Sequence, residues 1–166
     1  EVDIALITPH AVFIVDVKGT RGSIEVQGSK WYPDGRRPFQ SPLPKLREHA
    51  KAIKGILTDK DPANRDLERL CVVEAVILAA PDAYLVDPRD RDADHVCTLK
   101  KATAFFASKG LLPNWASDNI KPFHKLLLKT ITGEARARTG PLVFGNWEVI
   151  ERIGASELFT EYRACN

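Results

Sequence analysis

Three ionisable residues near the start of the chain have the types and the spacing of a hydrolytic centre. Asp3 lies in one apolar, β-branched run, and Asp16 and Lys18 lie in the next one. A turn at Pro9 and His10 separates the two runs. If that turn is the tip of a hairpin, Asp3 lies directly across from Asp16, and both project from the same face as Lys18. Because two opposed carboxylates repel each other, this pairing predicts a cation between them.

The predicted ligands suit a hard divalent cation such as Mg²⁺ or Mn²⁺, which prefers oxygen ligands. We expect Asp3 and Asp16 to bind it, with Glu1 as a further ligand because the same register places Glu1 across from Lys18. The Lys18 ammonium can neutralise charge on a phosphate oxygen and orient or deprotonate a water molecule. Hydrolysis of a phosphodiester requires these parts: an activated water, charge relief at phosphorus and a stabilised leaving oxygen.

The residues around these charges help to distinguish a functional site from a hairpin that is charged only for solubility. Charged residues on an edge hairpin can serve only to keep the edge soluble. Ala5, Ile7, Val12 and Ile14 share the face of the charged residues, however, so the charges border an apolar core. Half-buried acids cost free energy, and functional sites are where such costs are tolerated.

The elements around the hairpin predict an α/β core with a mixed sheet. We expect a third strand at 23–31, a loop at 32–38 and a helix over 43–57 that begins at Ser41-Pro42. A buried strand at 72–80 and a short strand at 84–86 should follow. Two further helices are expected, one over 98–108 with Leu99, Ala102 and Phe106 facing inward and one over 117–132. If the turn at Thr20-Arg21 joins the second and third strands directly, Glu25 falls opposite Asp16 as a third metal ligand.

The charge pattern points to a polyanionic partner. The net charge is only +2, but residues 18–60 hold ten basic against four acidic side chains, and the rest of the chain is acidic. The alternative is two solvated surfaces of opposite sign. The candidates for contacts with nucleic-acid phosphates are Lys30, Arg36, Arg37 and Lys45. Trp31 is expected to pack on the following helix rather than on a base.

Other reactive side chains show no convincing pattern. The histidines lack the spacing of a metal site, and we assign them no role. Asp90, Asp92 and Asp94 have the alternation of a calcium loop without its glycine and final glutamate, so we expect a solvated loop.

Composition sets the broad class of the protein. The chain has 166 residues, 44% hydrophobic and 28% charged, which fits a globular domain with a fragment of a second. Three cysteines without CxxC spacing argue against disulfides or structural zinc and predict a reducing cytoplasm. The sequence shows no secretory leader and no apolar run long enough for a membrane span, so no membrane partner is expected.

The first third of the chain resembles the nuclease-related domain (NERD) family. Glu1-x-Asp3, the run Val12–Gly19, a Gly-x-Ile strand and Trp31 carry the resemblance, which is good over residues 1–57 and extends to about 133 only by order of elements. It implies a restriction-endonuclease-like mixed β-sheet flanked by helices and Mg²⁺-dependent cleavage of DNA. Asp3 would be the first acid and Asp16-Val17-Lys18 the D-x-K motif, with the Val17 backbone carbonyl as another metal ligand. Family members have glutamine where this chain has Lys45.

The tail is similar to the opening strands of protein kinases. The stretch 145–154, rich in strand formers and ending at Gly154, is followed by Tyr162-Arg-Ala, with Ser156 and Phe159 at the later glycine positions. We therefore expect a NERD nuclease-like domain at 1–133, a linker at 134–141 and the truncated start of a kinase N-lobe at 142–166. That order resembles the PglW-type serine/threonine kinases of bacterial phage growth limitation (BREX) systems. A fragment this short cannot phosphorylate anything.

Two functions follow as hypotheses. The first is a metal-dependent DNA endonuclease domain in a phage-defence kinase, with DNA and other defence proteins as partners; a homodimer would suit cleavage of both strands. The second is a non-catalytic sensor that binds nucleic acid or a partner and regulates the attached kinase.

Overall fold

The computed structural model describes residues 2–62, 64–87, 89, 92–134, 143–144, 147–155 and 160–165, with side chains up to residue 132. The chain divides into two compact units, Glu1–Thr132 and Gly133–Asn166. In the described ranges, no helix combines the length and the apolar composition that crossing a membrane requires.

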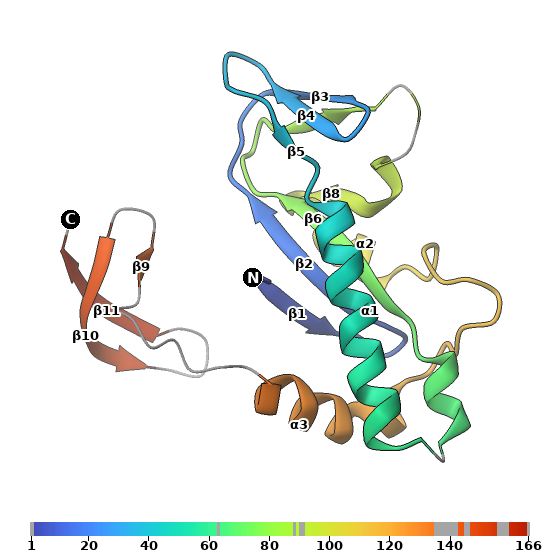
Figure 1. Cartoon of the computed structure of the whole chain (residues 1–166). Helices are drawn as coiled ribbons and strands as arrows, with labels where there is room; N and C mark the ends of the chain where they lie inside the picture. Colours follow the sequence, from blue (N-terminus) through green and yellow to red (C-terminus); the bar gives the residue numbers. More distant parts are fainter. Residues whose placement is uncertain are drawn as a thin grey trace. The chain divides into compact units, whose positions relative to one another are not determined.

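A four-stranded mixed sheet forms the centre of the first unit (Figure 1). Its strands, in spatial order, are β1 (Ile4–Ile7), β2 (Val12–Lys18), β6 (Val72–Leu78) and β8 (Val96–Thr98). β1 is antiparallel to β2, whereas β2, β6 and β8 run parallel. The predicted hairpin is confirmed: Thr8 and Ala11 close its turn through the bond from Thr8 N to Ala11 O, 2.9 Å, and the bond from Ala11 N to Thr8 Oγ1, 3.0 Å.

β2 is buried on both faces because its apolar residues alternate between two cores. Val12 and Ile14 pack into the core under α1 (Leu43–Lys60). Phe13 and Val15 pack into the opposite core with Phe106 of α2 (Ala102–Ala107). β6, predicted as a buried strand, is buried at every position after its first. Together these layers give the predicted mixed α/β architecture.

A second four-stranded sheet lies where β2 ends and α1 begins (Figure 1). Its order is β5 (Phe39–Gln40), β4 (Lys30–Pro33), β3 (Ser23–Gln27) and β7 (Tyr84–Val86), with β3 parallel to β7 and antiparallel to β4. The single strand expected at 23–31 is therefore two strands. Gly28, with φ of 64°, permits the tight turn between them.

The prediction that Glu25 faces Asp16 is wrong. β3 does not pair with β2 but turns away into the second sheet, where Glu25 is exposed and paired in register with Tyr32 and Val86. Gly22, with φ of 71°, lies in the connection between the two sheets.

α1 forms where the apolar spacing predicted a helix, with Pro44 tolerated in its first turn. Its buried stripe consists of Leu43, Leu46, Ala50 and Leu57. The described part of the first unit also contains 3₁₀ helices: η1 (Arg65–Arg69), η2 (Ala93–His95), η3 (Leu99–Lys101) and η4 (Lys121–Phe123).

The two later helices are shorter than predicted. Thr98 belongs to β8, and the turn that follows leaves Leu99 59% exposed, although the prediction placed it inward. Phe106 is buried as expected. The helix expected over 117–132 begins with η4 and continues as α3 (His124–Glu134), because Ser117 and Asn119 bond to each other in a local turn.

The second unit is a three-stranded antiparallel sheet. Its order is β11 (Thr160–Cys165), β10 (Trp147–Ala155) and β9 (Val143–Phe144), with register shifts in β10 at Val149/Glu151 and Arg152/Gly154. The expected linker, apart from residue 134 in α3, and the glycine-loop positions 156–159 lie outside the described residues.

Asp92 corrects part of the expectation that the acidic segment is a solvated loop. Its Oδ2 accepts hydrogen bonds from Trp31 Nε1 at 2.7 Å and from Ser41 Oγ at 2.9 Å. Trp31 is fully buried and packs beside Leu43 in the core under α1, as expected. Asp92 therefore ties the segment before β8 to the second sheet and to the start of α1. Asp90 lies outside the described residues.

We expect Asp92→Ala to destabilise the first unit by about 1–3 kcal/mol, because it leaves a buried indole N–H and a buried hydroxyl without an acceptor. Urea unfolding followed by circular dichroism measures the loss. Asp94→Ala, which removes an exposed carboxylate from the same segment, is the control and should change stability by less than about 0.5 kcal/mol. Equal effects of the two variants would contradict the assignment.

Candidate active site

The register of the first hairpin brings Asp3 to Asp16. Ile4 pairs with Val15, so Asp3, one residue before β1, is level with Asp16. Asp3 Oδ2 accepts a hydrogen bond from the backbone N–H of Val17 at 2.8 Å. The Asp3 carboxylate thus lies against the β2 backbone, between the two charged positions of the D-x-K motif. The Asp3 side chain is otherwise exposed.

Asp16 and Lys18 lie on the α1 side of β2, at the point where burial of the strand ends. Their side chains are 18% and 32% exposed, and Lys18 Nζ is 2.8 Å from Asp16 Oδ2. Asp16 Oδ2 is itself buried and accepts no well-oriented hydrogen bond from the residues that the structure describes. The ammonium therefore neutralises a carboxylate oxygen whose lone pairs are not otherwise used.

The residues present fit a divalent cation with water among its ligands. Asp3 and Asp16 supply two carboxylates, and among the described residues the buried Oδ2 of Asp16 has the Lys18 ammonium beside it but accepts no well-oriented hydrogen bond. Within the described ranges there is no cluster of three or more His, Cys, Asp or Glu side chains able to hold a metal ion. Mg²⁺ suits such a site because it commonly binds through one or two carboxylates and keeps several waters. Glu1 lies outside the described residues.

The two flanks of α1 carry different charges over the sheet. Arg47 lies on one flank, where its Nε is 2.7 Å from Glu74 Oε1 on β6. With 3.6 residues per turn, Lys45 and His49 lie on the other side of the buried stripe. Since the sheet order is β1-β2-β6, that second flank is the one nearer to β1 and β2.

His49 is a candidate that the sequence analysis left without a role. Its Nδ1 is buried and has no hydrogen-bond partner among the described residues. Burial lowers the pKa of His49, and the positive charge of Lys45 lowers it further. The imidazole is therefore neutral near pH 7 and has a free ring nitrogen. The signal in the sequence was its spacing of one helical turn from Lys45.

The four predicted phosphate-binding residues are all exposed, but they lie on separate elements. Lys45 is in the first turns of α1, and Lys30 is on the exposed face of β4. Arg36 and Arg37 are in the loop between β4 and β5, where Gly35, with φ of 64°, makes the turn. These three elements, namely the start of α1, β4 and the loop between β4 and β5, lie at the end of the first unit where β2 ends (Figure 1). The basic residues therefore lie on elements at the same end of the first unit as Asp16 and Lys18.

Part of the chain matches a known protein family. Residues 1–79 match the family model of the nuclease-related domain, NERD. The match runs from the first hairpin to the end of β6 and therefore contains Asp3, Asp16 and Lys18. It indicates a nuclease-related function for this part of the chain. No curated protein and no solved structure gives a match.

The lowered pKa of His49 predicts a pH dependence with a definite sign. The unfolded chain binds a proton near pH 6.5 and the folded chain only at lower pH, so folding loses stability as the pH falls below about 6.5. His49→Gln should remove this part of the loss, measured by urea unfolding between pH 7 and pH 5. Lys45→Ala should raise the pKa of His49 in an NMR titration. Identical pH profiles for the native protein and His49→Gln would contradict the assignment.

Proposed function

We propose that the first unit is a metal-dependent endonuclease domain that hydrolyses phosphodiester bonds in DNA. The observation that carries the proposal is the hairpin register, which sets Asp3 beside Asp16 with the Lys18 ammonium 2.8 Å from the Asp16 carboxylate. The family match over the same residues supports it. A Mg²⁺ or Mn²⁺ ion held by Asp3, Asp16 and the carbonyl of Val17 would supply Lewis acidity at the scissile phosphate.

Each side chain of the proposed site has a separate role in binding the metal or the phosphate. Asp3 is held in place by the Val17 N–H, so its free oxygen has a defined position relative to β2. Lys18 stabilises negative charge that develops on a phosphate oxygen, and in the free protein it offsets the charge of Asp16. Lys45, at the start of α1, binds a neighbouring phosphate and holds the backbone of the nucleic acid over the sheet edge.

Removal of either charged residue of the motif should abolish cleavage. We expect Asp16→Asn and Lys18→Met to lower the rate of nicking of supercoiled plasmid at least about 100-fold in the presence of Mg²⁺ or Mn²⁺. Asp82→Asn, which changes an exposed carboxylate in the turn after β6, is the matched control and should retain the native rate. Nicking by the Asp16→Asn protein at the native rate would contradict the nuclease proposal.

A second candidate function is a non-catalytic sensor that binds nucleic acid. The exposed basic residues Lys30, Arg36, Arg37 and Lys45 lie on elements other than β1 and β2, and this favours the sensor, because their binding to a nucleic-acid backbone does not require the metal site. Binding of DNA by the native protein, without metal uptake in calorimetry and without cleavage, is the result that selects the sensor.

Both functions predict a salt-dependent affinity for DNA. Each phosphate neutralised contributes a slope of about −0.9 to a plot of log K against log salt. The double variant Arg36→Ala/Arg37→Ala should therefore reduce the slope by up to about 2, measured by fluorescence anisotropy between 50 and 200 mM salt. Lys125→Ala/Lys129→Ala, with the same charge change on the exposed side of α3, is the control. An unchanged slope in the arginine variant would show that Arg36 and Arg37 do not contact DNA phosphates.

We also propose that the second unit begins a kinase-like domain. The antiparallel pairing of β10 with β11 and the position of Gly154 near the end of β10 support this proposal. On this hypothesis the whole protein is a cytoplasmic phage-defence kinase of the PglW type, the nuclease-like unit acts on invading DNA, and two copies act together when both strands are cut. Expression of the longer chain, followed by assays for phosphotransfer and oligomeric state, tests these parts separately.

A further inference from the structure

A cavity of about 580 Å³ lies at the opposite end of α1 from Lys45. It is bounded by Asp61, which follows the last residue of α1, by η1, and by the segment that leads into α3. The volume is in the range of small-ligand sites. It is separated from the candidate active site by the length of the central sheet, since η1 precedes β6 and the carboxylate pair lies near the end of β2 (Figure 1).

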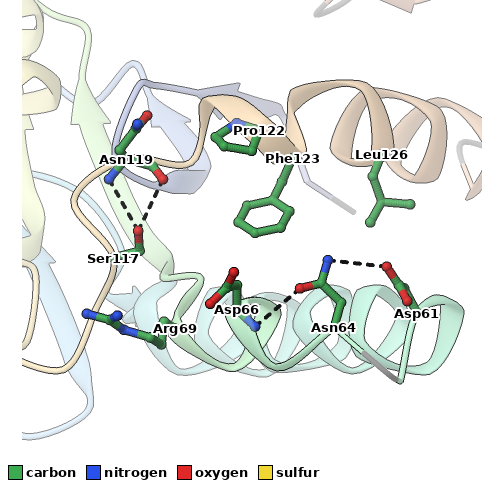
Figure 2. Close-up of a pocket in the computed structure, with 9 residues that line it drawn as sticks. All are labelled: Asp61, Asn64, Asp66, Arg69, Ser117, Asn119, Pro122, Phe123 and Leu126. Carbon is green, nitrogen blue, oxygen red and sulfur yellow. Dashed lines mark hydrogen bonds between the residues drawn. The ribbon is translucent and has the colours of Figure 1, made fainter.

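The two walls of this cavity differ in chemistry. Figure 2 shows Pro122, Phe123 and Leu126 on one wall and Asp61, Asn64 and Asp66 on the other. The Phe123 ring is directed across the cavity towards Asp66 and Asn64. The site therefore offers an apolar, aromatic surface facing oxygen acceptors.

The hydrogen bonds within the polar wall leave the Asp66 carboxylate free. Asn64 donates from Nδ2 to Asp61 Oδ2 at 3.2 Å, and its Oδ1 accepts from the backbone N–H of Asp66 at 3.2 Å. No described residue forms a hydrogen bond or an ion pair with the carboxylate of Asp66. Both oxygens are available to a ligand that donates two hydrogen bonds.

The charge of the cavity favours a cation over an anion as its ligand. Asp61 and Asp66 contribute two negative charges, and Arg69, which also lines the cavity, contributes one positive charge, which leaves an excess of one negative charge. The guanidinium of Arg69 extends away from Phe123, and its Nε donates to Trp115 O at 3.3 Å (Figure 2). The cavity therefore favours a positively charged ligand group that has hydrogen-bond donors and no acceptors.

We propose that this cavity binds a guanidinium group. Guanidinium is planar and has donors only, so it can stack on the Phe123 ring while two of its N–H groups bond to Asp66 in the paired geometry that carboxylates accept. Leu126 and Pro122 then contact the aliphatic chain that carries the group. The same chemistry is offered by a small guanidine and by an arginine side chain of a peptide. The site is independent of the proposed nuclease centre.

NMR titration of the whole chain with four probes tests this proposal. The probes are agmatine, its diamine counterpart putrescine, a short neutral peptide with one arginine, and the same peptide with lysine. We expect agmatine and the arginine peptide to shift amides of η1 and η4 and to bind at least about tenfold more tightly than their amine counterparts. Binding of the arginine peptide without agmatine identifies a protein segment as the source, and the reverse identifies a small guanidine.

Two variants connect the binding to the residues. Asp66→Asn should weaken binding of agmatine or of the arginine peptide about tenfold or more, because it removes a charge-assisted pair of hydrogen bonds. Phe123→Leu keeps an apolar side chain and removes only the aromatic face, so it should also weaken binding while the fold persists. Asp82→Asn is the control. The proposal is overturned by absence of binding of both guanidinium probes, by equal binding of putrescine, or by native affinity in Asp66→Asn.

Discussion

The parallel pairing of β2 with β6, with apolar cores on both sides of it, decides where the charged groups of this protein lie. The side chains of Val12 to Val15 alternate between the two cores. The face of the sheet on which each later residue of β2 lies is therefore fixed. Asp16 is the first polar residue after that run, and it falls on the α1 side where the core ends. A shift of one residue would bury the carboxylate in the core with α2, which would cost several kcal/mol. The position of Asp16 is thus a consequence of packing.

The antiparallel strand β1 then completes the arrangement from the outer edge. Its register follows from the short turn closed by Thr8 and Ala11. Asp3 comes beside Asp16 for that reason, and the Val17 N–H holds it there. The Lys18 ammonium offsets the repulsion of the two carboxylates in the free protein. A cation would add to this stabilisation, and so the same geometry serves both stability and metal binding.

α1 separates two electrostatic environments that lie over one sheet. On the β6 flank, Glu74 is buried and paired with Arg47, and the nearby His95 Nδ1 contacts the backbone oxygen of Glu74 at 3.1 Å. These groups satisfy one another. On the other flank, His49 Nδ1 has no partner in the described part of the chain, and burial holds the pKa of this histidine low. A buried ring nitrogen without a partner can bind a ligand, and this supports the proposal that the site lies on the His49 flank.

The sequence by itself determined the local features. Alternation of apolar residues set the strands, their spacing set α1, and the two-residue turn set the register that joins Asp3 to Asp16. Tertiary structure alone decided the features that depend on contacts between distant segments. Glu25 was misplaced because a chain that leaves a strand through glycines can enter either sheet, and pairing with β7, about 60 residues later, selects the second one. Asp92 and His49 gained their surroundings in the same way: a polar side chain acquires a buried partner, or lacks one, only when elements far apart in the chain pack together.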